Sequence, residues 1–147
     1  MKKNITLESL NTGEEQKILE MIRSDETLID TFGTGKDRIS RLLNSTYTAI
    51  IKNDNNPVGF VMMTDPRQTD THEIDIGILT KYRGQGYGSE ALKLLKNIIA
   101  FNQIKTSVQV SKCNEPAIKA VTNSGFTLVN SDEKYNFYTL ETKSTRK

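Results

Sequence analysis

Apolar residues along this chain recur with the periods of both helices and strands. Helical spacing and end signals predict helices over residues 14–30, 36–44, 89–101 and 114–125. Runs rich in β-branched and aromatic residues predict strands over residues 46–52, 58–64, 72–79, 106–110, 126–129 and 134–140. This order predicts an α/β (α+β) domain, in which helices cover a mixed sheet.

The run at residues 72–79 has the clearest strand pattern. Its isoleucines occupy alternate positions and therefore share one face, while Glu73, Asp75 and Gly77 share the other. A glycine-rich segment follows this run directly and leads into the predicted helix that ends near Phe101. Any chemistry on the polar face of this strand would therefore lie next to the glycine-rich turn.

Composition excludes several classes of protein. The chain has 147 residues, a formal net charge of +2, one cysteine and one histidine. These numbers allow one hydrophobic core, and they leave no intramolecular disulfide and almost no ligands for a metal site, so we expect none. The basic residues are scattered, which argues against nucleic-acid binding. Neither a membrane-spanning run nor a secretory signal is evident, so we expect a cytoplasmic protein.

The glycine-rich segment Arg83–Ser89 is the strongest chemical signal in the sequence. Its glycines allow a sharp turn and close approach of a ligand, and the following helix start offers unpaired amides to an anion. The spacing fits neither the dinucleotide fingerprint nor the nucleotide P-loop. A tight turn without a ligand is the alternative interpretation.

Arg83-x-x-Gly86-x-Gly88 matches the pyrophosphate loop [QR]-x-x-G-x-[GA] of the GNAT N-acetyltransferase superfamily. The stretch 76–83 resembles the strand that leads into that loop. Asn114-x-x-Ala117, followed by Gly125-Phe126, resembles the family's second motif, and the hairpin around residues 57–60 resembles two of its strands. The chain therefore resembles GNAT proteins over residues 45–140.

The resemblance implies a single GNAT domain over residues 1–147. Its mixed, mostly antiparallel sheet would have six to seven strands, split between the strands at 72–79 and 106–110, with about four flanking helices. Residues 1–44 would form variable helices on the substrate side, and residues 141–147 a basic tail. Such proteins are commonly monomers or homodimers.

The resemblance also implies a site for acetyl-CoA. The backbone of Ile76, Gly77 and Ile78 would pair with the pantetheine arm. The pyrophosphate would meet the loop, whose members are Arg83, Gly84, Gln85, Gly86, Tyr87, Gly88 and Ser89. Asn114 would contact the arm, and its alternative role is to cap the helix that follows.

The catalytic residues are less clear, because two positions depart from the family. Val121 stands where many members carry a tyrosine acid, and Gln109 where some carry a glutamate base. Glu73 matches another position that holds a catalytic glutamate in some members, and Asp75 shares its face. We expect Glu73 first, and Asp75 second, to be the general base; both could instead be solvated or attract a cationic substrate.

Two functions remain open at this stage. The first is an acetyl-CoA-dependent N-acetyltransferase acting on a primary amine, either a small cationic amine or a peptide N-terminus. The second is a non-catalytic module that binds acyl-CoA, which Gln109 and Val121 favour. An acidic stretch that includes Asp65 and Asp70, besides Glu73 and Asp75, is expected to attract the amine.

Overall fold

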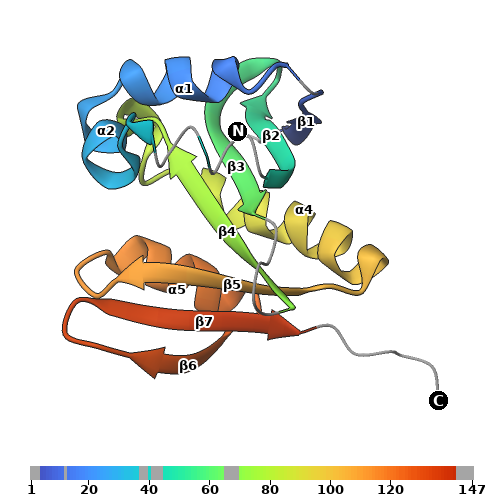
Figure 1. The fold of residues 1–147 in the computed structure, drawn as a ribbon, viewed down its shortest axis with the longest axis vertical. Helices are drawn as coiled ribbons and strands as arrows, with labels where there is room; N and C mark the ends of the chain where they lie inside the picture. The colour runs from blue at the N-terminus through green and yellow to red at the C-terminus, as the bar shows by residue number, and fades with distance from the viewer. Residues whose placement is uncertain (1–3, 12, 37–39, 41–44, 65–69, 142–147) are drawn as a thin grey trace.

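The two β-rich runs after residue 44 form a hairpin inside a seven-stranded sheet with the order β1-β2-β3-β4-β5-β7-β6 (Figure 1). The computed structural model describes residues 4–11, 13–36, 40, 45–64 and 70–141. The strands are β1 (Ile5–Ser9), β2 (Ser45–Asn53), β3 (Asn56–Thr64), β4 (Thr71–Ile78), β5 (Lys105–Ser111), β6 (Thr127–Ser131) and β7 (Tyr135–Glu141). The helices are α1 (Gln16–Arg23), α2 (Glu26–Phe32), the 3-10 turn η1 (Thr80–Tyr82), α4 (Tyr87–Asn102) and α5 (Glu115–Asn123). Mixed α/β architecture is therefore confirmed.

The alternation along β3 explains why helices cover both faces of the sheet. Phe60 and Met62 point to one side and pack with the buried residues of α1 and α2. Val61 and Met63 point to the other side and pack under α4 and α5. Because successive side chains of a strand face opposite ways, one buried strand supplies both layers of core. Figure 1 shows α4 crossing behind β3 and β4.

Residues 14–30 do not form one helix, and that prediction is wrong. The helix α1 ends at Arg23 and α2 begins at Glu26, with extended backbone at Asp25 between them (φ −142°, ψ 112°). The Asp25 side chain accepts hydrogen bonds from the amides of Thr27 and Leu28, and so caps α2. A carboxylate that caps a new helix competes locally with continuation of the previous one.

The strand β1 is absent from the sequence-based prediction. Its apolar residues, Ile5 and Leu7, are too few for a clear period, and its pairing partner is β2, with Ile5 opposite Asn53. The register of an edge strand depends on this distant partner. The helix predicted over 36–44 falls mostly on residues 37–39 and 41–44, which lie outside the described residues.

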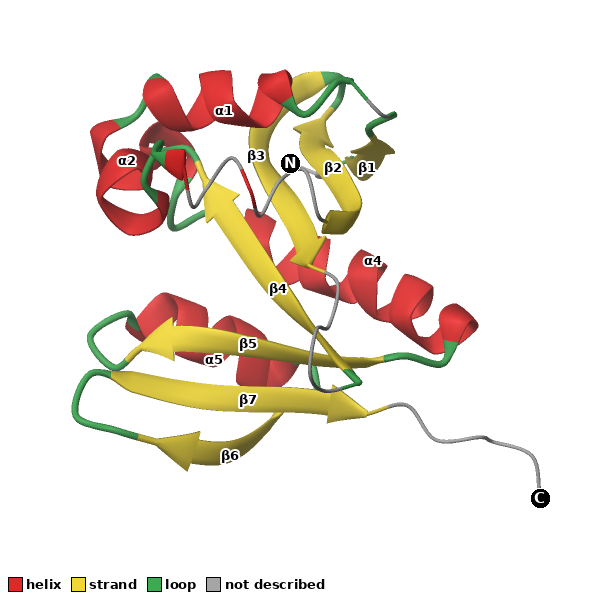
Figure 2. Ribbon diagram, viewed as in Figure 1, coloured by secondary structure: helices red, strands yellow, loops and turns green. Residues whose placement is uncertain are grey.

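The predicted split in the sheet is confirmed. Strands β4 and β5 run parallel, and their pairing runs from Thr71↔Lys105 only as far as Glu73↔Ser107. Beyond Glu73, no residue of β4 pairs with β5 in the described part of the sheet. Figure 2 shows the consequence: β5, β7 and β6 swing away from β4 as the two strands proceed. None of the described helices is long and apolar enough to cross a membrane.

Candidate active site

The diverging strands β4 and β5 enclose a cleft with a volume of about 780 Å³. Residues 73–78 of β4 form one wall and residues 107–111 of β5 the other. The glycine-rich segment and the first residues of α4 lie at the open end, and residues of α5 complete the lining. The structure therefore brings the polar face of β4 and the glycine loop to one cavity, as the sequence predicted.

At two positions, the glycine loop has a backbone conformation that only glycine adopts easily. Gly84 and Gly86 have φ values of 77° and 86°, and α4 begins directly after Gly86. Gly88 differs, because it lies in the first turn of α4 without a positive φ, and a Cβ added there would meet nothing within 4 Å. Gly84 and Gly86 thus shape the turn, whereas Gly88 keeps the cleft open beside the helix start.

The other predicted loop residues take different places. The Nε of Arg83 donates to the carbonyl of Ile78 at 3.0 Å, which holds the loop against the end of β4. Tyr87 is buried and lines the cleft, and its hydroxyl accepts a hydrogen bond from the Nδ2 of Asn53. The Nε2 of Gln85 donates a hydrogen bond to the carbonyl of Lys81, and Gln85 does not line the cleft.

Asn114 caps α5 at the edge of the cleft. Its Oδ1 accepts from the amide of Ala117 at 3.2 Å, and Pro116 follows in the first turn. The capping role left open by the sequence is therefore observed. Asn114 also lines the cleft, so a contact with a ligand stays a prediction.

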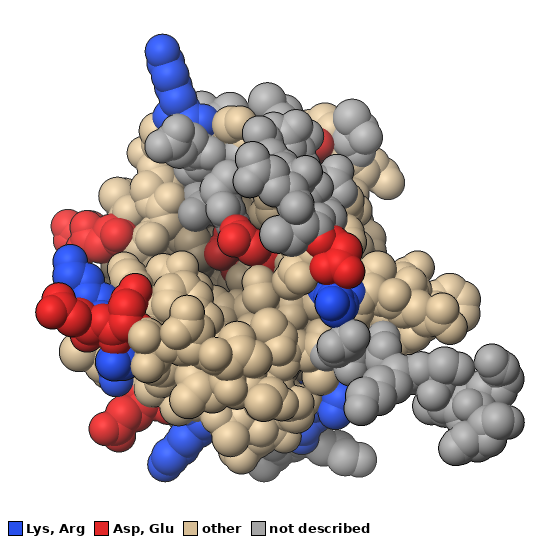
Figure 3. Space-filling view, turned by 60° about the horizontal axis from the view of Figure 1, so that its bottom comes forward, with Lys and Arg blue, Asp and Glu red and all other residues tan. Residues whose placement is uncertain are grey.

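Acidic side chains also line the cleft. Glu73 and Asp75 line it from β4, and Asp30 lines it from α2. Figure 3 shows acidic side chains gathered near the middle of one face of the molecule. Asp70, in contrast, lies 3.5 Å from the Nζ of Lys105, and Asp65 lies outside the described residues. Of the described members of the predicted acidic stretch, Glu73 and Asp75 therefore line the cleft.

Residues of α2 in the lining were missed by sequence reasoning. They are Asp30, Thr31 and Phe32. The ring of Phe32 packs edge-on against Phe60, with ring centroids 5.2 Å apart, above Gly77 of β4. No local pattern could have shown that the end of α2 reaches β4. The absence of a side chain at Gly77 was the one signal, because it leaves room on that face.

The family is decided by comparison with known proteins. A model of the "Acetyltransferase (GNAT) family" matches residues 15–126. This chain belongs to the GNAT family. The match confirms the resemblance seen in the glycine loop and in the Asn114 motif, and it identifies the protein as an N-acetyltransferase. No curated protein sequence matches the chain.

Solved structures share the GNAT fold with this chain. RimL, a ribosomal L7/L12 alpha-N-protein acetyltransferase in complex with coenzyme A, is 13% identical with a TM-score of 0.73, over 94% of each chain. The yncA protein of Salmonella typhimurium, with its cofactor acetyl-CoA, is 16% identical with a TM-score of 0.72, over 95% of this chain and 94% of its own. A chimera of spermidine N-acetyltransferase SpeG from Vibrio cholerae and hSSAT is 14% identical with a TM-score of 0.69, over 92% of this chain and 96% of its own. At these identities, the likeness concerns the fold.

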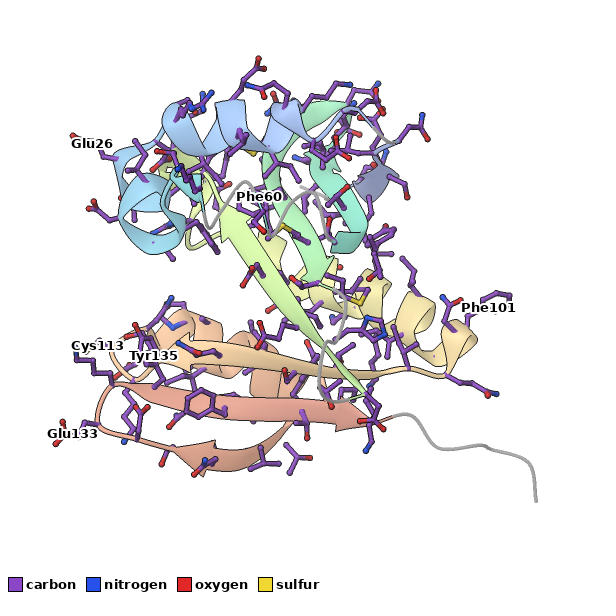
Figure 4. The ribbon with its side chains drawn as sticks, viewed as in Figure 1. Glu26, Phe60, Phe101, Cys113, Glu133 and Tyr135 are labelled. Carbon is purple, nitrogen blue, oxygen red and sulfur yellow. The ribbon has the colours of Figure 1, made fainter. Side chains whose placement is uncertain are left out.

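The two departures from GNAT patterns both lie in the cleft. Gln109 and Val121 are among its lining residues, and Val121 is buried. Tyr138 is buried in the core, where its hydroxyl accepts a hydrogen bond from the Nδ2 of Asn136. Tyr135 lies opposite Ser111 at the open end of the cleft (Figure 4). Among the described lining residues of this GNAT cleft, Glu73 and Asp75 carry carboxylates near the closed end.

His72, the one histidine in the sequence, does not line the cleft. The Nδ1 of His72 lies 3.5 Å from the hydroxyl of Thr46, away from the cleft lining. Within the described ranges, no group of three or more histidine, cysteine, aspartate or glutamate residues could hold a metal ion.

Proposed function

We propose that this GNAT protein transfers the acetyl group of acetyl-CoA to a primary amine, by direct attack in a ternary complex. The acceptor is a small cationic amine or a peptide N-terminus. The observation that carries the proposal is the cleft between β4 and β5, which opens onto the glycine loop at the start of α4. Its structural neighbour yncA has acetyl-CoA as its cofactor, and RimL is in complex with coenzyme A.

The residues at the open end fit the phosphate end of such a ligand. Gly84 and Gly86 expose backbone, Gly88 leaves space, and the start of a 16-residue helix adds amides and a positive dipole end. Hydrogen bonds to a charged group contribute about 1.5–3 kcal/mol each. Three of them would supply about half of the ~8 kcal/mol that a micromolar ligand needs.

The diverging part of β4 fits the arm of the same ligand. Its backbone from Ile76 to Ile78 lies beyond the last pair with β5 and lines the cleft. A ligand with amide groups would extend the sheet there, as an added strand does. Asn114 lies across the cleft on α5, where its side chain would meet the same arm.

The closed end carries the groups that handle the proton. Bound acetyl-CoA supplies the thioester whose acetyl group is transferred. An amine with a pKa near ~10.4 must lose a proton before it attacks, which costs about 4–5 kcal/mol at neutral pH. Glu73 is the first choice to accept that proton, directly or through water, and Asp75 the second. A thiol leaving group has a pKa near ~8.5, so its departure needs an acid less.

Charge along the cleft separates the two substrates. Glu73 and Asp75 line the part near the last β4–β5 pair, and Arg83 lies at the other end with the helix start. From Glu73 to Ile78 the strand spans about 16 Å. A cationic acceptor would therefore approach the acidic part while an anionic cofactor meets the loop. SpeG is a spermidine N-acetyltransferase and RimL acts on a protein N-terminus, and both acceptors are amines.

The test is a panel of amines incubated with acetyl-CoA and the wild-type protein. Release of free CoA and the mass of the product are both measured. A product heavier by one acetyl group is the expected result and would identify the acceptor. Tight CoA binding with no product from any amine would instead favour the acyl-CoA-binding module that Gln109 and Val121 allow.

A further inference from the structure

One carboxylate joins the two halves of the cleft. Asp25 lies at the start of α2, and its side chain also reaches Thr80, 55 residues away in the turn after β4. The amide of Thr80 donates to Asp25 Oδ2 at 2.7 Å, and the Thr80 hydroxyl donates to Oδ1 at 2.8 Å. The same Oδ1 accepts from the amides of Thr27 and Leu28 in α2. Four donors from two elements thus converge on one side chain.

The two joined elements belong to different parts of the cleft. The helix α2 ends in Asp30, Thr31 and Phe32, which line the cleft, and Phe32 lies over Gly77 of β4. Thr80 begins η1, and its carbonyl accepts from the amide of Arg83, the first residue of the glycine loop. Asp25 is therefore the point at which the acceptor side and the cofactor side are tied together.

The far end of α2 is held as well. Phe32 contacts Phe60 and lies over Gly77, so α2 is anchored across the last part of β4 at both of its ends. Any loosening at Asp25 would reach both the wall formed by α2 and the turn that leads into the loop.

We propose that Asp25 is a positioning residue that couples the acceptor-side wall to the cofactor loop. It holds Thr80 and α2 in one arrangement, so that filling the loop also orders the wall against which the amine would lie. The coupling works in both directions, because a link that lets one ligand favour the other's site must act reciprocally. This inference rests on the proposed function, since it assigns the loop to CoA.

Asp25→Asn separates the two roles of the side chain. Asparagine caps helices about as well as aspartate, so α2 keeps a cap. It has only one oxygen acceptor, however, and its NH₂ group cannot accept from the Thr80 amide. The variant can keep the α2 bonds or the Thr80 amide bond, but not all four. Glu14→Gln is the matched control, because the Glu14 carboxylate also accepts a backbone amide, from Asn11, but joins only neighbouring residues.

The first measurement is hydrogen exchange of the unliganded proteins. Asp25→Asn should speed exchange in residues 26–32 and also in residues 80–86, while Glu14→Gln should leave both segments unchanged. Faster exchange confined to residues 26–32 would mean that Asp25 is only a cap, and would overturn the proposal. This result does not depend on CoA, so it stands even if the proposed function fails.

The second measurement uses CoA itself as the probe. CoA should slow exchange in residues 26–32 of the wild-type protein as well as in the loop, and in Asp25→Asn only the loop should respond. The dissociation constant of CoA should rise about tenfold, because binding must then order a looser loop. Thr80→Val should also weaken CoA binding. The variant with both Asp25→Asn and Thr80→Val should bind CoA no more weakly than whichever single variant has the higher dissociation constant. The coupling would be overturned if the effects of Asp25→Asn and Thr80→Val on the dissociation constant of CoA were additive. An equal loss of CoA affinity in Glu14→Gln would overturn it as well. Absence of CoA binding by the wild type would instead refute the proposed function.

Discussion

Glu73 of β4 and Ser107 of β5 form the last pair of the parallel ladder, and the sheet opens directly beyond them. The favoured base therefore lies at the point where the cleft begins. A carboxylate there is near the closed end, whereas the glycine loop lies at the open end. Under the proposed function, this separation would put proton transfer and phosphate binding at opposite ends of one strand, so that mutations can separate their effects.

Glu73→Gln should lower kcat by about 100-fold or more, because removal of a general base commonly costs that much. The KM for acetyl-CoA should change little, since the loop is untouched. Steady-state kinetics with the amine found in the panel provides the measurement. Glu133→Gln, in the exposed turn before β7, is the control. An unchanged kcat in Glu73→Gln would remove this residue as the base and leave Asp75 to be tested.

Gly86→Ala should lower the stability of the fold, whereas Gly88→Ala should weaken the binding of acetyl-CoA. Gly86 has a φ of 86°, so alanine there should cost about 1–2 kcal/mol of folding free energy. Gly88 has space for a methyl group and no positive φ, so its variant should unfold like the wild type. That methyl would nevertheless enter the cleft and raise the KM for acetyl-CoA. Urea unfolding and kinetics of both variants would separate the effects; normal CoA binding by Gly88→Ala would speak against this site for the phosphates.

Gly77→Ala should destabilise the fold. A Cβ there would lie 2.5 Å from Cε2 of Phe60 and 3.0 Å from Cε2 of Phe32. Overpacking of this kind commonly costs about 1–3 kcal/mol. Gly35→Ala is the matched control, because a Cβ there meets nothing within 4 Å. Equal stability of the two variants in urea would show that α2 does not press on β4.

The charge of Asp30 should matter to the acceptor and not to the cofactor. Asp30→Asn should raise the KM for a cationic amine a few-fold, about the size expected for one exposed charge, and the effect should shrink in high salt. Glu26→Gln removes a charge one turn earlier on the same helix, outside the cleft lining, and is the control. Equal effects of both changes on the KM would indicate that the amine responds to the overall negative charge of α2 and not to Asp30 at the cleft.

The pH dependence of stability should report the Asp25 bonds. Burial raises the pKa of Asp25, but the hydrogen bonds from Thr80 and from the α2 amides outweigh it and hold that pKa below its ordinary value. A lowered folded-state pKa means that the ionised group stabilises the fold above the ordinary value of ~3.9, and that this contribution is lost as pH falls through the lower one. The stability difference between wild type and Asp25→Asn should therefore be constant from neutral pH to about pH 5 and shrink below about pH 4. Urea unfolding across this range is the measurement; a difference independent of pH would contradict the assignment. Glu14 and Asp132, whose pKa values are also lowered by hydrogen bonds to backbone amides, titrate in both proteins and cancel.

Much of the fold, and the meeting of the glycine loop with the polar face of β4 at one cleft, could be predicted because the signals are local. The alternation along β4, the hairpin turn with positive φ at Asp54 and Asn55, and the glycine loop each lie within one short window of sequence. Within such a window, the period of apolar residues and the conformational freedom of glycine and asparagine act directly. The same locality explains why Asn114 could be assigned as a helix cap.

The part of the cleft lined by α2 was decided only by the tertiary structure. The local sequence around Asp25 predicts one continuous helix, and the bond of its carboxylate to Thr80 is visible only in the fold. The roles of Asp30 and Phe32 in the cleft lining likewise depend on where α2 crosses β4. These contacts join segments separated by more than 40 residues, and they depend on which faces of the sheet the helices cover. The sequence alone determined the family, the glycine loop and the polar face of β4. The three-dimensional packing determined which carboxylates share the cleft, because pairing between distant segments follows from the whole core and not from any local period.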